Sequence, residues 1–374
     1  MYRFIHSSDL HLGKGFGNFE GDLPGRLREA RHAVLAKLAE QARRSGADTI
    51  LLAGDTFDSE TPAAHVRRQA LAEMKHHDTI RWVILPGNHD SLQAAQLWTA
   101  LGSEAPENVT LAVEAQPLQL APDVMLLPAP CTTRRPGRDL TEWMDGQSSS
   151  PETIRIGLAH GAVQSFSENA SFADIIAPDR AGRAGLDYLA LGDWHGALEI
   201  DPRTRYSGAP EPDRFKHERP GEALLVNIAG PGAVPQVTTF PTQSFSWHTL
   251  NLHLLSGEDA VTSLGDVLPD SRERRQTLLR LVVSGHCRLN DRTRLATAIA
   301  SATPDFAFVD FDDSGLFTDC EADDLDMIDR GGALREAANA LLAEASDHTR
   351  SAAERDIARA ALTRLFSYAQ EVGS

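Results

Sequence analysis

Short apolar runs and helical stripes alternate along the first part of the chain. Residues 2–6 alternate, and residues 49–53 and 81–85 are apolar runs; each of the three segments predicts a strand. Residues 26–45 and 62–78 carry apolar side chains at helical spacing, which predicts a helix between successive strands. Because these strands are apolar on both faces, the pattern is typical of a parallel sheet between helical layers, and hence of an α/β fold.

The pattern changes after the third predicted strand. Residues 109–130 contain short apolar runs separated by prolines, which favours antiparallel strands, and a weak helical pattern follows at 139–144. Residues 153–159 and 187–191 are again continuous apolar runs that predict buried strands. Short strands are expected from there to residue 240.

A second alternation of strands and helices starts at residue 243. Its predicted strands are 247–255, 277–284 and 305–311, and its predicted helices are 257–267 and 291–302. This order predicts a small α+β domain. An acidic stretch and two more helices follow, so the predicted domains are residues 1–242, 243–318 and 319–374.

Composition limits the class of protein. The 374 residues are 41% apolar and 24% charged, as expected for a globular protein of two or three domains. No run approaches the length of a membrane span and no signal-peptide pattern occurs, so a cytoplasmic protein without a membrane partner is expected. Cys131, Cys287 and Cys320 show no paired spacing, which argues against a disulfide framework or a thiolate zinc site.

The net charge of −17 is unevenly distributed. Residues 301–374 hold six Arg against sixteen Asp and Glu, which is ten of the seventeen excess negative charges. The rest of the chain is only mildly acidic. The global charge therefore neither supports nor excludes a nucleic-acid substrate.

Polar side chains suited to metal binding follow five of the predicted strands. In chain order they are Asp9 and His11, Asp55, Asn88 and His89, His160, and Asp193 and His195. The ends of parallel strands meet at one edge of a sheet, so these side chains are expected to lie together. Carboxylate, imidazole and amide groups without a thiolate suit Mn²⁺, Fe²⁺ or Zn²⁺. These potential ligands are more than one ion needs, which predicts two ions. Asp55, on a central strand, is predicted to be the carboxylate that bridges them.

The loops that carry these residues resemble the motifs of a known family. Asp9-x-His11, Gly54-Asp55, Gly87-Asn88-His89-Asp90, His160-Gly161 and Gly192-Asp193-x-His195 resemble the calcineurin-like metallophosphoesterases. Segments 6–13, 53–58 and 206–212 look like those of the SbcD-type DNA-repair nucleases. The resemblance implies a four-layer αββα core, a small DNA-facing capping domain, and C-terminal helices that bind a coiled-coil ATPase.

The resemblance also implies a role for each site residue. Asp9, His11 and His195 would bind the first ion, Asp55 would bridge, and Asn88, His160 and position 193 would bind the second. His89 would be the catalytic histidine, oriented by Asp90. The two divalent ions, with Mn²⁺ favoured over Fe²⁺, Mg²⁺ and Zn²⁺, would activate water for attack on a phosphodiester. His89 would protonate the leaving oxygen or stabilise the developing charge.

Position 193 departs from the family pattern. The family has Gly-His-x-His in this loop, whereas this chain has Gly192-Asp193-Trp194-His195. A carboxylate also binds Mn²⁺ or Fe²⁺, but its charge would make the second ion less electrophilic. We expect Asp193 to be a ligand, because the flanking residues match. The alternative is that Asp193 points away and the second ion is weakly held.

Basic residues cluster in three further places. They are Arg134, Arg135 and Arg138; Arg214, Lys216, His217 and Arg219; and Arg272, Arg274 and Arg275. Each cluster either contacts a phosphate backbone or is a solvated surface segment, and the loop of Arg134, Arg135 and Arg138 is the strongest candidate for DNA binding. In the last helix, Ile357, Ala361, Leu365, Tyr368 and Val372 form a stripe that either packs on its own domain or binds a partner.

Three functions are compatible with these features. The first is a two-metal DNA nuclease subunit that works with an SMC-like ATPase in DNA repair or processing. The second is a phosphodiesterase or phosphatase acting on nucleotides or small phosphoesters. The third is a weakly active scaffold subunit of an ATPase complex. The family commonly dimerises, so a homodimer is a further expectation.

Overall fold

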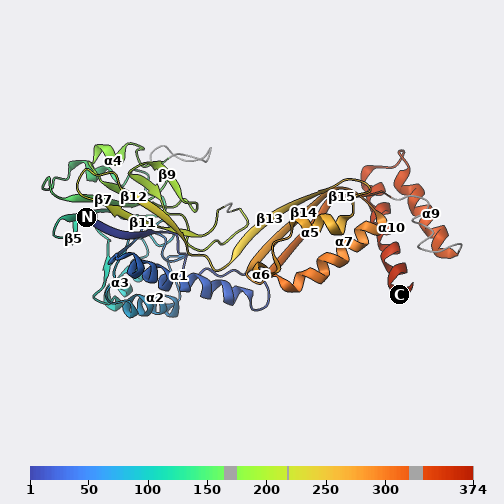
Figure 1. The fold of residues 1–374 in the computed structure, drawn as a ribbon, viewed down its shortest axis with the longest axis horizontal. Coiled ribbons are helices and arrows are strands. Elements are labelled where there is room, and N and C mark those ends of the chain that lie inside the picture. The colour runs from blue at the N-terminus through green and yellow to red at the C-terminus, as the bar shows by residue number, and fades with distance from the viewer. Residues whose placement is uncertain (164–174, 217–218, 320–331, 374) are drawn as a thin grey trace. The chain divides into compact units, whose positions relative to one another are not determined.

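The computed structural model describes residues 1–163, 175–216, 219–319 and 332–373. The chain forms two compact units, Met1–Ser246 and Trp247–Ser374 (Figure 1). Each unit has hydrophobic core clusters of its own. Among the described residues, no helix combines the length and the apolar character needed to cross a membrane.

Two six-stranded sheets form the centre of the first unit. The first, in the order β12-β11-β1-β2-β3-β4, consists of β1 (Tyr2–Ser7), β2 (Thr49–Leu52), β3 (Arg81–Ile84), β4 (Val109–Leu111), β11 (Glu222–Ile228) and β12 (Gln236–Pro241). The second, in the order β5-β6-β7-β8-β10-β9, consists of β5 (Leu118–Ala121), β6 (Val124–Ala129), β7 (Ile154–His160), β8 (Tyr188–Gly192), β9 (Leu198–Asp201) and β10 (Thr204–Tyr206). Strands β1 to β4 are parallel to one another, and so are β6, β7, β8 and β10.

Alternate residues of the same strands pack on opposite faces of the first sheet. Ile50 and Trp82 face a layer of three helices, α1 (Leu23–Ser45), α2 (Ala64–His76) and α3 (Ala95–Glu104). Leu51 and Val83 face the second sheet. The other side of the second sheet is covered by α4 (Arg180–Arg183) and the 3₁₀ turn η1 (Glu142–Gly146). The predicted αββα order of layers is therefore confirmed, and it explains why the central strands are apolar on both faces.

The prediction of antiparallel strands in residues 109–130 is only partly right. β5 and β6 are antiparallel, whereas β4 lies parallel to β3 and β6 lies parallel to β7. Pro117 and Pro122 lie outside the strands, whereas Pro128 lies within β6 and pairs with Leu158. Strand direction is decided by pairing with partners far along the chain.

The second unit contains a three-stranded sheet in the order β13-β14-β15. Its strands are β13 (Ser246–Leu254), β14 (Thr277–Arg288) and β15 (Phe308–Asp319), and its helices are α5 (Ala260–Val267), α6 (Ser271–Arg274), α7 (Leu289–Ala302), the 3₁₀ turn η3 (Thr303–Asp305), α9 (Ala333–Ser346) and α10 (Ala352–Gly373). Apart from Asp319, the predicted acidic stretch lies outside the described residues.

Helix α10 buries a face that only partly overlaps the predicted apolar stripe. Ala358, Leu362 and Phe366 are buried. Leu362 and Phe366 pack with Leu289 and Ala338, and Leu365 of the stripe packs against the same cluster. Ile357 and Tyr368, from the predicted stripe, are 69% and 58% exposed. The two faces are offset by one residue, because the neighbouring helices α7 and α9 decide which side of α10 is covered.

Candidate metal centre

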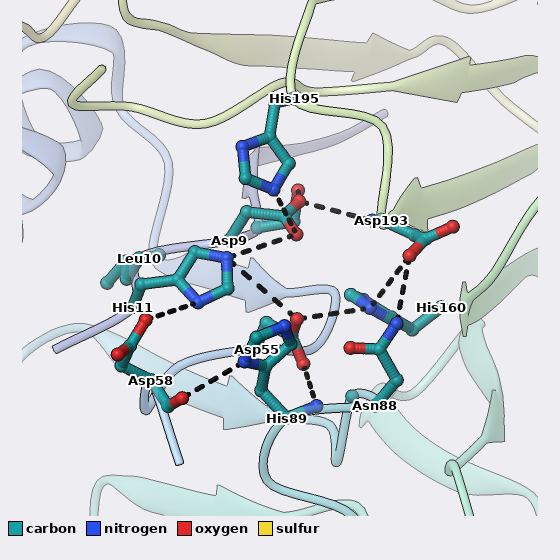
Figure 2. Close-up of polar contacts among 12 residues, drawn as sticks. Asp9, Leu10, His11, Asp55, Asp58, Asn88, His89, His160, Asp193 and His195 are labelled. Atoms are coloured by element: carbon teal, nitrogen blue, oxygen red, sulfur yellow. Dashed lines mark hydrogen bonds and ion pairs between the residues drawn. The ribbon is translucent and has the colours of Figure 1, made fainter. Parts of the chain in front are cut away.

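The predicted ligands converge from loops of both sheets. Asp9 and His11 follow β1, Asp55 follows β2, and Asn88 and His89 follow β3, all in the first sheet. His160 ends β7, and Asp193 and His195 follow β8, in the second sheet. Figure 2 shows these side chains pointing toward one another. The sequence pattern placed them on the edge of one sheet, whereas the structure assembles them from two facing sheets.

The backbone is held in an unusual conformation at four ligand positions. Asp9, His11, Asp55 and Asp193 have positive φ angles of 55°, 44°, 52° and 99°. Hydrogen bonds between the loops hold them there: Asp9 N donates to Gly54 O (3.1 Å) and His11 N donates to Asp55 O (3.0 Å). Such strain in non-glycine residues is concentrated at functional sites, since it must be stabilised by the surrounding structure.

Close packing explains three glycines of the motifs. A Cβ atom at Gly54 would lie 2.3 Å from His160 Nδ1, and one at Gly87 would lie 2.1 Å from Asp55 Oδ1. A Cβ atom at Gly192 would lie 2.1 Å from the carbonyl oxygen of Ala53. Only glycine allows the loops to approach this closely, so these three glycines serve the packing of the ligands.

Four residues surround the candidate first ion site. One ligand atom from each of Asp9, His11 and His195 lies within 4.8 Å of the others. His11 Nε2 lies 3.9 Å from Asp55 Oδ2, and His195 Nε2 lies 3.9 Å from Asp9 Oδ1. These separations exceed hydrogen-bonding distance, so the atoms surround a shared space without bonding to each other.

The second ion site shares Asp55 with the first. His160 Nε2 lies 3.5 Å from Asp55 Oδ2 and 3.8 Å from Asp193 Oδ1. Asn88 Nδ2 donates a hydrogen bond to Asp193 Oδ1 at 3.0 Å. A carboxylate only accepts hydrogen bonds, so this contact fixes the amide orientation and leaves Asn88 Oδ1 as a donor atom for an ion.

Buried atoms without partners show that the residues fit metal ions. Among the described residues, Asp9 Oδ1, His11 Nε2, Asn88 Oδ1 and His160 Nε2 are buried and accept or donate no hydrogen bond. Buried polar atoms are normally satisfied, because leaving one unpaired costs about 1–3 kcal/mol. Divalent ions at the two sites would satisfy all four atoms.

The buried side chains of Asp55 and His160 shift each other's pKa in opposite directions. Burial alone raises the pKa of Asp55, but the neighbouring His160 and His11 outweigh it and hold that pKa below its usual value. Burial alone lowers the pKa of His160, and the Asp55 carboxylate outweighs it and holds the His160 pKa well above its usual value. Asp55 is therefore ionised, as a bridging ligand must be.

Asp58 contacts both His11 and His89. Its carboxylate Oδ1 lies 3.3 Å from His11 Nδ1, and its backbone carbonyl oxygen lies 3.0 Å from His89 Nδ1 (Figure 2). Each contact favours a proton on Nδ1 and leaves Nε2 as the functional nitrogen. Asp58, whose sequence context was compatible with orienting a ligand or with a turn, thus positions one predicted ligand and the predicted catalytic histidine.

The prediction that Asp90 orients His89 is wrong. The Asp90 carboxylate accepts hydrogen bonds from the backbone N–H groups of Gly87 (2.7 Å) and Phe57 (3.0 Å). Burial, followed by the charge of Asp55, raises the pKa of Asp90 to about 7. Asp90 holds the loop together and not the imidazole ring, because its side chain turns back toward its own loop.

Sequence reasoning missed a buried ionic network behind the first site. Asp213 Oδ2 lies 3.0 Å from Lys14 Nζ and 3.5 Å from Arg31 Nη2, and Lys14 Nζ lies 3.5 Å from Asp58 Oδ1. Arg31 is 1% exposed and donates to the carbonyl oxygen of Leu10. A charged residue within the apolar stripe of α1 was the available signal.

The basic clusters differ in their surroundings. Arg134 and Arg135 are exposed and line a hollow with Gln93. Their loop adjoins the His89 loop, since Leu92 N donates to Cys131 O (2.9 Å) and Cys131 N donates to Pro86 O (3.1 Å).

The other clusters are paired with acids or only partly described. Arg272 and Arg274 pair with Asp270 and Asp305, and Arg214 pairs with Asp213. In each of these pairs the carboxylate offsets the charge of its arginine, so less positive charge is left for phosphate. Arg138 is exposed like its neighbours, and His217 lies outside the described residues.

Comparison with known proteins agrees with this geometry. Residues 2–227 match the calcineurin-like phosphoesterase family, and the chain belongs to that family. The chain is 27% identical over 237 residues to an uncharacterized metallophosphoesterase, YhaO, of Bacillus subtilis (strain 168), which covers 60% of this chain and 57% of YhaO. It is 28% identical over 288 residues to the SbcD chain of nuclease SbcCD from Rhodobacter capsulatus, which covers 64% of this chain and 69% of that protein.

The similarity leaves part of these relatives unmatched. The chain spans a little over half of YhaO and about two thirds of the SbcD chain. Among solved structures, TT1561 of Thermus thermophilus aligns with a TM-score of 0.41 and 11% identity over 64% of this chain and 99% of that chain. The predicted resemblance to the phosphoesterase family, and within it to SbcD-type proteins, is confirmed.

Proposed function

We propose that this chain is the nuclease subunit of a DNA-processing complex and hydrolyses phosphodiester bonds with two divalent ions, Mn²⁺ being favoured. The observation that carries the proposal is the convergence of seven ligand residues and His89 at one site (Figure 2). Similarity to the SbcD chain of a nuclease SbcCD supports DNA as the substrate and an SMC-like ATPase as the partner.

The chain's own residues have separable tasks in this reaction. Bound ions would polarise the phosphodiester and lower the pKa of water. Asp58 holds His89 through its carbonyl oxygen, so that Nε2 faces the site and can stabilise the developing charge or protonate the leaving oxygen. Asp90 fixes the loop that presents both Asn88 and His89.

Two surface features support the substrate and the partner. The loop of Arg134 and Arg135 is hydrogen-bonded to both ends of the Pro86–Leu92 segment, where it would meet a phosphate backbone near the ions. Helix α10 exposes Ile357 and Tyr368 beside its buried face, which leaves apolar side chains for a partner helix. A cytoplasmic location and a homodimer belong to the same proposal.

The test is hydrolysis of linear double-stranded DNA, single-stranded DNA and a small phosphodiester with Mn²⁺. We expect hydrolysis of DNA, and a rate at least about 100-fold lower in His89→Ala, since a general acid contributes about 10²–10⁴-fold. His76→Ala, an exposed histidine at the end of α2, is the matched control and should keep the wild-type rate.

The other outcomes are distinct. Hydrolysis of the small phosphodiester but of neither DNA overturns the nuclease assignment in favour of a small-molecule phosphodiesterase. If no substrate is hydrolysed although both ions are bound, the chain is a scaffold subunit. A rate unaffected by His89→Ala removes His89 from the mechanism.

A further inference from the structure

An exposed tryptophan lies between two ligands of the metal centre. Trp194 is 42% exposed, whereas Trp82, Trp98 and Trp247 are buried and Trp143 is partly buried. The Cα atoms of consecutive residues are about 3.8 Å apart, so the backbone of Trp194 lies next to Asp193 and His195. Trp194 therefore adjoins two predicted ligands along the chain, and its large aromatic side chain reaches Gly196 of the same loop.

Arg219 lies beside this tryptophan. A Cβ atom at Gly196 would be 3.5 Å from Trp194 Nε1 and 3.7 Å from Arg219 Cδ, so both side chains pass over the same glycine. Arg219 is exposed, and its Nη1 donates a hydrogen bond to the carbonyl oxygen of Ala197. An indole and a guanidinium thus share one surface, the Trp194–Arg219 surface.

The backbone beneath this surface is held firmly. Ala209 N donates to the carbonyl oxygen of His195 at 2.9 Å. Gly208, with φ of 75°, packs so closely that a Cβ atom there would lie 2.6 Å from Ala197 N. A loop whose backbone is already held loses little conformational entropy when a ligand binds, so the surface has a preorganised base.

We propose that the Trp194–Arg219 surface binds a nucleobase of the substrate by stacking, next to the phosphate that the metal centre cleaves. Every base offers a flat π face to an indole, and a neighbouring guanidinium adds cation–π attraction and positive charge. The positive charge also offsets the acidic ligands nearby, which would otherwise repel a polyanion. The inference rests on the proposed function for the source of the base, which is an unpaired residue of a DNA strand.

The test measures binding of a labelled single-stranded oligonucleotide and of an abasic oligonucleotide of the same length. The full chain carries His89→Ala and Mn²⁺ is present, so that the probe is not consumed. Trp194→Ala is expected to weaken binding of the normal oligonucleotide about 10-fold, in line with stacking by single aromatic residues, and to leave the abasic probe nearly unchanged. Trp194→Phe should restore most of the affinity.

Val234→Ala is the matched control, because Val234 is 62% exposed in the same unit and lies in the loop between β11 and β12. Val234→Ala should leave the affinity for the normal and for the abasic oligonucleotide unchanged. The fluorescence of the one exposed tryptophan should also be quenched by the normal oligonucleotide and not by the abasic one. The inference is overturned if Trp194→Ala loses affinity equally for both probes, or loses affinity for neither.

Failure of the inference and failure of the proposed function are distinguishable. If the chain hydrolyses DNA and Trp194→Ala binds both probes like the parent, the base surface is absent and the nuclease assignment stands. If DNA is not hydrolysed, but binding of a mononucleotide phosphodiester depends on Trp194, the base surface stands and its ligand is a free nucleotide.

Discussion

The Asp193 carboxylate determines the orientation of the Asn88 side-chain amide. The Asn88 amide donates to the Asp193 carboxylate at 3.0 Å, so its own oxygen is turned toward the second ion site. An imidazole at position 193 would not impose this orientation and would bring a nitrogen in place of an oxygen. If Asp193 is a ligand, the second site would offer three oxygen-bearing groups and one imidazole, a set that suits Mn²⁺ or Mg²⁺ better than Zn²⁺.

Replacing Asp193 should change metal binding at one site only. Asp193→Ala is expected to weaken binding of the second ion about 10–100-fold, as loss of a supporting group does at other metal sites, and to lower the rate. Asp193→His should keep two ions, shift preference toward Zn²⁺ and raise activity at lower pH, because a negative charge is removed. Metal content by mass spectrometry and pH–rate profiles measure both effects. If neither substitution alters occupancy or rate, Asp193 is no ligand.

At the scale of elements, His6 connects the two sheets of the first unit. His6 lies in β1, its Nδ1 is 3.0 Å from the hydroxyl of Tyr188 in β8, and its Nε2 is 3.1 Å from the carbonyl oxygen of Leu191. A carbonyl only accepts, so Nε2 carries the proton and Nδ1 accepts from Tyr188. Burial lowers the pKa of His6 to about 3, which keeps the ring neutral.

The low pKa of His6 predicts a loss of stability in acid. The unfolded chain, where histidine has a pKa of about 6.5, binds the extra proton first. The stabilisation is therefore complete above pH 6.5 and declines as the pH falls toward 3, with a slope of about 1.4 kcal/mol per pH unit. Urea unfolding of chelator-treated protein measures the free energy of unfolding between pH 7 and pH 4. This free energy should fall less steeply with decreasing pH in His6→Gln than in the wild type. His76→Gln, at an exposed histidine, should keep the wild-type slope, and identical slopes in all three proteins contradict the prediction.

Element patterns differ in how much they predict. The stripe of α1 predicted its buried side, and the helix ends at Gly46 with φ of 69°, as a C-terminal glycine should. The stripe of α10 predicted its buried side only in part, at Leu365. Helix α1 packs on a sheet whose face is fixed, whereas α10 packs on two helices whose position the sequence does not reveal.

At the scale of the whole molecule, the candidate metal centre belongs to one unit. In the described ranges, the groups of side chains able to hold an ion, made from Asp9, His11, Asp55, Asp58, His89, His160 and His195, all lie in Met1–Ser246. A ligand stabilises the folded unit that binds it. Metal binding should therefore stabilise the two units unequally.

Removal of metal should destabilise the first unit alone. With an ion at 100 times its dissociation constant the stabilisation is about 2.7 kcal/mol. Hydrogen exchange measured by mass spectrometry should show faster exchange in peptides from residues 1–246 after chelation, and unchanged exchange in peptides from 247–374. Asp55→Asn, which weakens both sites, should exchange like the chelated protein. If chelation speeds exchange equally in both units, the bound ions do not lie in the first unit alone.

The sequence by itself determined which residues end the strands and which chemistry they carry. Asp9, His11, Asp55, Asn88 and His160 could be singled out because each follows an apolar run, and a strand with its terminal loop is a local feature. The αββα layers were available only through the resemblance to a family, since the apolar runs alone indicated a single sheet.

The tertiary structure decided every contact between distant parts of the chain. The predicted ligands come from loops of two sheets, and His89 Nδ1 contacts the carbonyl oxygen of Asp58 and not the Asp90 side chain. The side chain of Trp194 lies beside that of Arg219. The sequence records what each side chain can do. Which groups meet depends on packing between strands and loops far apart in the chain, and no local pattern contains that information.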